Sequence, residues 1–423
     1  MRQETHHDAP AAAGGSRARR DLRIAAALAG GSACGDSLAK SALVLRVHDV
    51  SHAPWSVTAL LLAGALPVAA CAPGAGLLAD RVDSRTLMIC ANAASALCCL
   101  WLTAVPSFGG LLLVVTLLGV TALTGATALN ALLPSLAEPG RLVDATARQR
   151  GATLLGGAVG LSSGGVLAEW AGTGAALALD AASFVLLGLG CAAIRTRRGP
   201  GGGSAGARRA GRRTGRPRRS PVPPLLLAVS AGSGVVALFA ATTNVVQVFF
   251  VKDVLGVGDA GYGLIAACWT GGMLACVPLA RQLPDRVSVL VGATVCGEAV
   301  TGLAVLGCGL LATVPATALC YVVAGLAASG MLIARGALVQ LLTPESARGR
   351  VQAAVGAVRQ ASTAAALGLG AALVEWGGPR IAFIVAGAGS LAVSLACGLW
   401  LCIAVRRPAG ARALAGPLSE PVR

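Results

Sequence analysis

Residues 76–85 read Gly76-Leu-Leu-Ala-Asp-Arg-Val-Asp-Ser-Arg85 and interrupt a strongly apolar part of the chain. The stretch places two acidic and two basic side chains between the apolar runs 56–78 and 87–105. A segment this short cannot form a domain, and its charges would be costly in lipid. The pattern therefore predicts a sharp turn between two membrane-spanning helices, on the cytoplasmic side of the membrane.

The composition extends this interpretation to the whole chain. The 423 residues are 55% hydrophobic and 12% charged, with a mean hydropathy of +0.74, whereas soluble domains carry about 25% charged residues. The apolar runs are continuous and do not alternate as the strands of a membrane barrel would. We therefore expect an all-α membrane protein with twelve spans, near 24–47, 56–78, 87–105, 109–133, 151–168, 176–194, 225–251, 263–280, 288–311, 314–340, 353–374 and 381–404.

The basic residues are unevenly distributed. Ten arginines and no acidic residue occur between Arg195 and Arg219, and they account for much of the net charge of +16. This Arg- and Gly-rich linker, residues 195–224, cannot bury apolar area, so we expect a disordered tether. It divides the spans into halves at 24–194 and 225–404, flanked by tails at 1–23 and 405–423. Attraction of the arginines to anionic lipid headgroups is a further interpretation; nucleic-acid binding is not expected.

Charge in the connections predicts the orientation. Arginine-rich connections alternate with connections that hold almost no basic residue, so the positive-inside rule places both termini and the linker in the cytoplasm. Only two lysines occur against 32 arginines, and alanine and glycine are abundant, which is typical of a high-GC bacterial genome. We therefore expect a multi-pass protein of a bacterial cytoplasmic (inner) membrane.

The two halves share a repeated pattern. Gly140-Arg141 precedes an apolar run that ends in Glu169-Trp170-Ala-Gly172, and Gly349-Arg350 precedes one that ends in Glu375-Trp376-Gly-Gly378. Transporters built from parallel repeats hold their substrate near the middle of the membrane, at the interface of the repeats. The repeat predicts this construction here.

Five segments carry a resemblance to a known family. They are the 76–85 loop, similar to Gly-x-Leu-Ala-Asp-Arg; Leu132–Leu142; Leu179-Asp-Ala-Ala-Ser-Phe184; Asp253–Gly256 with Gly261-Tyr-Gly263; and Thr343–Val351. In this order and spacing the chain resembles the major facilitator superfamily over essentially its whole length. It is most similar to the drug:proton antiporter branch, which includes siderophore (enterobactin-type) exporters and macrolide-efflux proteins.

The resemblance implies roles for two glycine-containing motifs. Gly76, Asp80, Arg81 and Arg85 would form a latch that holds one access state; the alternative is a topological anchor with solvated charges. The second-half copy, Arg281–Arg286, has diverged.

In the fifth span, small residues resemble the antiporter motif, although Leu161 replaces its usual proline. Ordinary helix packing explains the same residues as well. They are Gly156, Gly160, Gly164 and Gly165.

Ionisable residues within the spans are candidates for proton coupling. A charge at the centre of a span costs about 2.5–3.5 kcal/mol on insertion scales, so it should face a cavity or a partner. Asp36 and Lys40 are four residues apart on one helical face. Asp36 would exchange the proton with Lys40 tuning it, or the two would form a static structural pair. Glu298 is a second carrier candidate, or a structural residue.

Other polar residues are assigned weaker roles. Asp180 lies near a span end and is interpreted as an interfacial anchor. Arg335 and Arg359 would line the cytoplasmic vestibule, pair with an acid, or extend to the interface. Asn130, Asn244 and Gln247 are candidate hydrogen-bonding groups of the cavity.

Together these patterns predict a secondary active transporter and not an enzyme. We expect a monomer without a cofactor, driven by the proton gradient, that moves a small molecule by alternating access. Efflux of a drug, siderophore or natural product is the first hypothesis. The alternatives are uptake of a nutrient by the same fold, or a transport-inactive sensor or scaffold.

Overall fold

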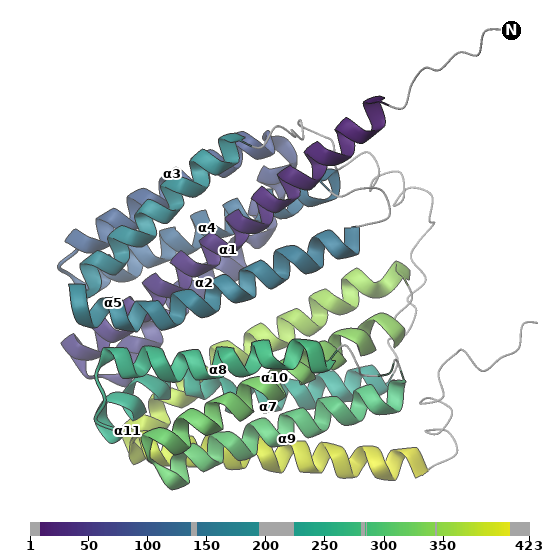
Figure 1. Ribbon diagram of the computed structural model, residues 1–423. Coiled ribbons are helices and arrows are strands. Elements are labelled where there is room, and N and C mark those ends of the chain that lie inside the picture. The colour runs from purple at the N-terminus through teal and green to yellow at the C-terminus, as the bar shows by residue number, and fades with distance from the viewer. Residues whose placement is uncertain are drawn as a thin grey trace, which may run out of the picture. The chain divides into compact units, whose positions relative to one another are not determined.

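The computed structural model describes residues 9–136, 142–193, 224–280, 284, 286–342 and 345–406, which contain helices and no strand. The helices in chain order are α1 (Ala9–Ser51), α2 (Pro54–Arg81), α3 (Ser84–Ala104), α4 (Phe108–Leu136), α5 (Leu142–Ala193), α7 (Pro224–Phe249), the π-helix η1 (Phe250–Val254), α8 (Asp259–Ala280), α9 (Val287–Leu311), α10 (Val314–Leu342) and α11 (Glu345–Arg406) (Figure 1).

Two of these helices each contain two spans. α5 has non-helical backbone angles at Gly172 (φ 78°, ψ 163°), and α11 has nearly the same angles at Gly378 (φ 77°, ψ 168°). Both glycines follow a Glu-Trp pair, so the repeated sequence forms a repeated structural break. With α5 and α11 each counted as two, the described residues form twelve α-helical segments, and the predicted twelve-helix, two-half fold is confirmed.

The stretch that suggested the fold is more helical than expected. α2 continues through Gly76 and Asp80 to Arg81, and α3 begins at Ser84, so only two residues separate the helices. α1 begins at Ala9, so part of the predicted N-terminal tail at 1–23 is helical. Alanine and arginine are good helix formers, and they extend the helix beyond its apolar part. The predicted linker and the C-terminal tail from residue 407 lie outside the described residues.

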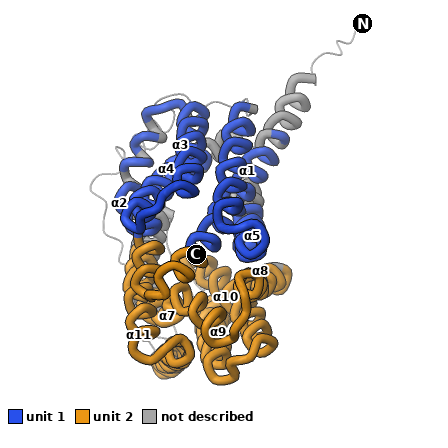
Figure 2. The backbone as a smooth tube through the Cα atoms, turned by 90° about the vertical axis from the view of Figure 1, so that its left-hand side faces the viewer, with its two compact units in different colours: residues 1–43, 63–217 blue, residues 44–62, 218–423 orange. Residues whose placement is uncertain are grey.

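The chain forms two compact units, which Figure 2 shows in different colours. Unit 1 comprises residues 1–43 and 63–217, and unit 2 comprises residues 44–62 and 218–423. The end of α1 and the start of α2 therefore belong to the unit that contains α7 to α11.

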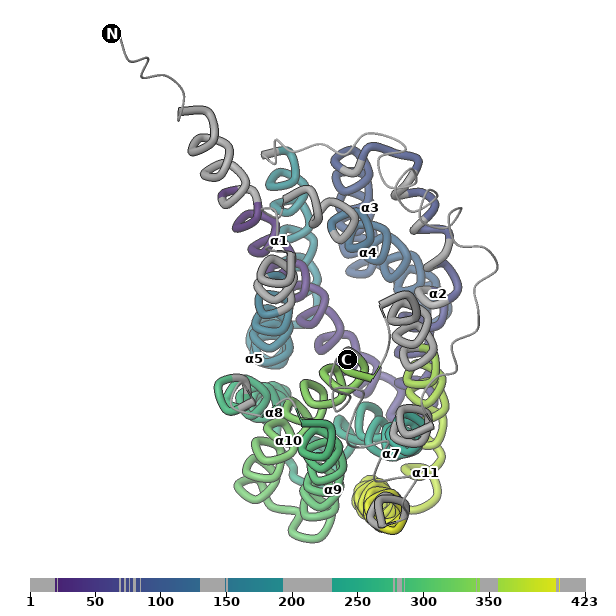
Figure 3. Tube along the Cα trace, turned by 90° about the vertical axis from the view of Figure 1, so that its right-hand side faces the viewer, coloured from purple at the N-terminus to yellow at the C-terminus, as the bar shows by residue number. Residues whose placement is uncertain are grey.

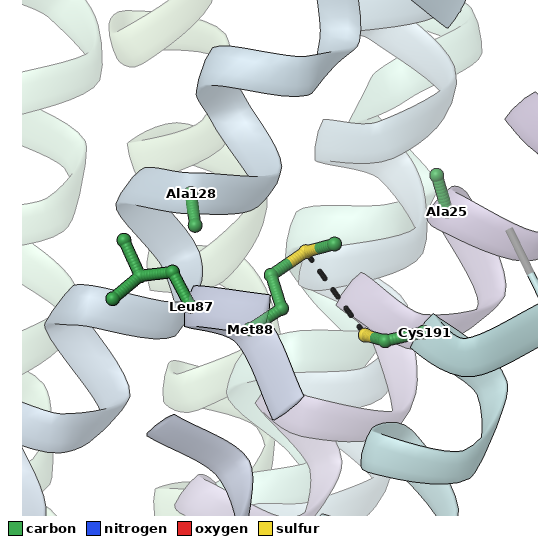
Figure 4. Packing of buried hydrophobic residues seen from close by; sticks show 5 residues of the cluster. All are labelled: Ala25, Leu87, Met88, Ala128 and Cys191. Carbon is green, nitrogen blue, oxygen red and sulfur yellow. Dashed lines mark hydrogen bonds between the residues drawn. The ribbon is translucent and has the colours of Figure 1, made fainter. Parts of the chain in front are cut away.

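Each unit has its own apolar core. In unit 1, Leu87 and Met88 of α3 pack with Ala128 of α4 and Cys191 of α5 (Figure 4). In unit 2, one cluster joins Leu290 and Val291 of α9 to α10.

Seven described helices are long and apolar enough to cross a membrane. Two of the seven apolar segments, 42 and 44 residues long, lie within the broken helices α5 and α11, and each is long enough for two spans. The multi-pass prediction is therefore supported by the lengths of the helices.

Candidate functional site

The glycines of the predicted antiporter-like motif lie where α1 and α5 meet. A β-carbon on Gly156 would lie 1.9 Å from the carbonyl oxygen of Gly30, and one on Gly160 would lie 1.9 Å from that of Cys34. Gly164 lies in the same way against Leu38, and Gly165 is buried. The two helices run side by side in Figure 3 because these positions carry no side chain.

The second half has a matching contact. Gly370 of α11 is 206 residues after Gly164, and a β-carbon there would lie 2.9 Å from the carbonyl oxygen of Thr242 on α7. Close packing of a half's first helix on its fifth is thus a property of both halves.

Asp36 and Lys40 lie on an exposed face of α1. Their side chains are exposed, whereas Leu38, Ala39 and Ala42 on the same helix are buried in unit 1. Among the ion pairs of the described residues, none joins Asp36 to Lys40. Both residues therefore have accessible surface, although protein atoms surround their charged ends, and the two groups do not neutralise one another by direct contact.

Asp180 is the buried acid of unit 1, with 1% of its surface exposed. Its Oδ2 accepts a hydrogen bond from the Cys99 thiol of α3 at 3.2 Å, and its Oδ1 accepts one from Ser183 at 3.3 Å. The carboxyl also lies directly against Gly35 of α1, the residue before Asp36. Three helical segments thus enclose a carboxyl group whose hydrogen-bond donors are neutral.

Glu298 is the buried acid of unit 2, with 2% of its surface exposed. It lies on α9 and accepts a hydrogen bond from the hydroxyl of Ser233 on α7. Arg335 of α10 is close enough for electrostatic attraction to Glu298, although no ion pair between them occurs among the described residues. Arg359 is exposed on α11, and its charge acts on Arg335.

Unit 2 also holds a network of charged side chains, which we call the His48 network: His48, Asp49, Lys252, Asp253 and Asp259. Lys252 Nζ lies 2.5 Å from Asp49 Oδ1 and 2.7 Å from Asp259 Oδ1. Buried His48 lies 3.2 Å from Asp49 through Nδ1 and 3.3 Å from Asp253 through Nε2, the latter without hydrogen-bond alignment. The network connects the end of α1 to η1 and the start of α8.

The electrostatics of Asp49 favour its charged form. Partial burial alone would raise the pKa of Asp49, but hydrogen bonds and charge interactions from Lys252 and His48 outweigh it and lower that pKa below its ordinary value. Lys252 and Asp253 belong to a π-helix, a rare geometry that occurs mostly as single-turn bulges and is frequent at functional sites.

Three predicted polar residues are less informative. Asn244 is exposed and donates a hydrogen bond to Ala241 in its own helix at 2.8 Å. Gln247 carries a buried Nε2 that has no hydrogen-bond partner among the described residues. Asn130 lies in α4, but its side chain lies outside the described residues.

Comparison with known protein families shows which family the chain belongs to. The sequence profile described as Major Facilitator Superfamily matches residues 26–249 and 229–420. The chain belongs to the Major Facilitator Superfamily. No curated protein matches it in sequence.

Solved structures of other transporters are similar to this chain in fold. A POT family transporter in complex with a thioalcohol-conjugated peptide has a TM-score of 0.72 at 11% identity, covering 90% of this chain and 96% of that chain. A bacterial homolog of the human lysosomal transporter Spinster, inward-facing and occupied, has a TM-score of 0.66 at 15% identity, covering 93% and 95%. The nucleoside transporter NupG has a TM-score of 0.67 at 11% identity, covering 90% and 99%.

The superfamily loop shows one clear structural contact. Arg85 donates a hydrogen bond to the carbonyl oxygen of Ala192, near the end of α5, where a cation also suits the helix dipole. Arg81 is exposed at the end of α2. The surroundings of Gly76 and the side chain of Asp80 lie outside the described part of the chain, so the latch remains a prediction.

Sequence reasoning missed two features of this superfamily member. Asp180 was interpreted as an interfacial anchor, yet its side chain is buried between three helical segments. Ser183, one turn after it, was the available signal for a partner. The His48 network was missed because its residues lie at the ends of spans and are some 200 positions apart.

Proposed function

We propose that the chain is a proton-coupled exporter of a small amphipathic compound, such as a drug, siderophore or natural product. The observation that carries the proposal is the position of Asp36 and Lys40, which are exposed on a helix whose neighbouring residues are buried in unit 1. A charge is not stable against hydrocarbon, so in a membrane this face would border a water-filled space. Asp36 is then a carboxyl that can exchange protons and face a substrate.

Alternating access needs contacts that hold one side of the protein closed. We assign this role to the His48 network, which joins the end of α1 to η1 and α8 within unit 2. The indole of Trp55 on α2 also donates a hydrogen bond to Glu375 of α11 at 2.5 Å. With both termini in the cytoplasm, as the positive-inside rule predicts, these contacts would lie on the outer side.

Glu298 is the second candidate proton carrier of the proposal. It is buried with a neutral hydroxyl donor, and Arg335 is near enough to balance its charge. The electrostatic attraction of Arg335 also supports the structural alternative. Transport by Glu298→Gln would separate the two, since a carrier is required at every cycle and a structural residue mainly affects stability.

Uptake of a small nutrient is the second candidate function. Solved proteins of the same fold are described as peptide and nucleoside transporters, but at 11% identity they indicate the fold alone. We prefer export because the glycines that bring α1 and α5 together belong to the motif that resembles the antiporter branch.

Expression in a drug-sensitive bacterial host separates the two directions. We would compare the wild-type chain, Asp36→Asn and the control Glu169→Gln, which removes an exposed carboxyl from α5, against toxic compounds and siderophores. Export predicts resistance and lower accumulation of at least one compound, lost in Asp36→Asn and retained in Glu169→Gln. Higher accumulation with the wild-type chain would contradict export and favour uptake. No effect on any compound would favour a sensor or scaffold.

A further inference from the structure

Asp180 is the most deeply buried acid in the described part of unit 1. Its carboxylate oxygens accept hydrogen bonds from the Cys99 thiol at 3.2 Å and the Ser183 hydroxyl at 3.3 Å. The same hydroxyl donates to the backbone oxygen of Asp180 at 2.8 Å. No arginine, lysine or histidine forms an ion pair with Asp180 among the residues that the structure describes. A buried carboxyl without a cation is suited to bind a proton, because its neutral form loses less hydration than its charged form.

The backbone of α1 lies against this carboxyl. A β-carbon on Gly35 would lie 2.1 Å from Asp180 Oδ1 and 2.5 Å from Ser183 Oγ, so only glycine allows this approach. The next residue is Asp36, whose side chain is exposed and whose charge interacts with that of Asp180.

The remaining titratable groups around Asp180 are thiols. Cys34 of α1 and Cys99 of α3 face it, and Cys98 adjoins Cys99. Among the described groups that interact with Asp180, Asp36 is therefore the one other carboxyl. Two neighbouring carboxylates repel each other, so binding of one proton to the pair is favoured.

We propose that Asp180 is a second proton-binding carboxyl and that it shares one proton with Asp36. Asp36 takes the proton from water at the exposed face of α1. The proton then passes to Asp180, so that the O–H bond of the Asp36 acid breaks as an O–H bond forms on the Asp180 carboxylate. The charge of the pair is unchanged by this transfer. The inference rests on the proposed function and adds a buried proton store to it.

The position of Gly35 gives this transfer a structural consequence. The carboxyl touches the backbone of α1, so its change of charge acts on the helix without an intervening side chain. The residues of α1 up to Leu43 belong to unit 1, and those from Val44 belong to unit 2. Protonation of Asp180 would therefore bias the packing of a helix that both units share.

Infrared spectroscopy of the purified full-length protein in liposomes tests the proposal, with the proton as the only ligand. The carbonyl stretch of protonated carboxyl groups is followed as the pH is varied, for the wild type, Asp180→Asn, Asp36→Asn and the control Glu169→Gln. We expect Asp180→Asn to remove one titrating component that persists in Glu169→Gln. In Asp36→Asn the midpoint of that component should shift to lower pH, because a neighbouring negative charge is lost. A titration unchanged by Asp180→Asn, or a midpoint unchanged by Asp36→Asn, overturns the shared proton.

Variants of Cys99 and Gly35 give a second test in case Asp180→Asn fails to fold. Cys99→Ala removes a donor to the carboxylate and should move the midpoint to higher pH, and Cys99→Ser should restore it. Gly35→Ala should perturb the same component, whereas Gly31→Ala, whose β-carbon would lie 3.8 Å from Leu187, should not. A component insensitive to both Cys99→Ala and Gly35→Ala also overturns the assignment.

The same titration is independent of the proposed function, because no transported compound is present. A titrating Asp180 in a protein without proton-coupled flux would leave the carboxyl pair standing and contradict only the proposed transport.

Discussion

At the scale of single residues, the glycines between α1 and α5 set how closely these helices approach. Gly160 lies so near the carbonyl oxygen of Cys34 that even a methyl group would force the backbones apart. We expect Gly160→Ala to destabilise the protein by about 1–3 kcal/mol, as overpacking does in well-packed interiors. The measurement is thermal unfolding in detergent. Gly151→Ala is the control, because that position has open space and gains helix propensity. Equal stability of Gly160→Ala and wild type would contradict the close approach.

The charge of Asp49 gives a prediction with a defined pH dependence. Its pKa is lower in the folded protein than its ordinary value, so the carboxylate stabilises the fold above the unfolded-state value of about 4. This stabilisation is lost as the pH falls through the lower, folded value. The side chain is 48% exposed, so we expect only about 0.2–1 kcal/mol. Asp49→Asn should therefore unfold at lower temperature than the wild type at pH 7, and the difference should disappear once the pH is below the folded pKa of Asp49. If the difference in unfolding temperature persists in acid, the effect of Asp49→Asn has a cause other than the lost charge.

The sequence could predict the environment of a single residue only where that environment depends on neighbouring positions in the chain. Asp36 could be recognised because a charge in the middle of an apolar run is unusual by itself. Asp180 could not be interpreted correctly, because its burial results from Gly35, Cys99 and Ser183 on three helical segments. The local sequence could not predict the ion pair of Lys252 with Asp49 either, because 203 positions separate the two residues.

At the scale of helices, the repeated Glu-Trp segments predicted the breaks at Gly172 and Gly378. Both residues have φ near 78° with ψ near 165°, a region that is essentially restricted to glycine. Gly172→Ala and Gly378→Ala should each cost about 1–3 kcal/mol, which thermal unfolding would measure. Gly174→Ala, with open space around it, should cost less. If only one of the two breaks is sensitive, the structural equivalence of the halves does not extend to their energetics.

Helix boundaries were predicted less well than helix existence. Apolar length locates a span, but it cannot show that α1 begins at Ala9 or that α2 runs on to Arg81. Those ends consist of residues that form helix in water as well as in lipid. The π-helix η1 was also not predictable, because no residue type is specific to its geometry.

At the scale of the whole molecule, the duplicated pattern predicted twelve helices in two halves, and the family match and the similar solved structures agree. The compact units divide differently, since residues 44–62 belong to unit 2. Sequence halves follow the duplication, whereas compact units follow the contacts of one conformation. In the proposed mechanism the His48 network holds the end of α1 in unit 2, and the contact of Trp55 with Glu375 holds the start of α2 there.

This assignment of the His48 network predicts an effect on transport that differs from an effect on proton binding. Lys252→Met removes the cation that contacts both Asp49 and Asp259. We expect vesicles that contain Lys252→Met to leak the compound identified by the resistance screen. The infrared titration of Asp180 should stay unchanged in this variant. Arg46→Met is the matched control, a loss of a basic residue near the same end of α1. Tight vesicles with full transport in Lys252→Met would exclude a closing role for the network.

Proton coupling through Asp36 can be measured as flux driven by a pH gradient. Purified protein would be placed in liposomes with an acidic interior, and uptake of the compound identified by the resistance screen would be followed over time. The account predicts accumulation above the external concentration for the wild type and for Glu169→Gln, and none for folded Asp36→Asn. Accumulation that is unchanged in Asp36→Asn, or that persists without the pH gradient, would contradict it.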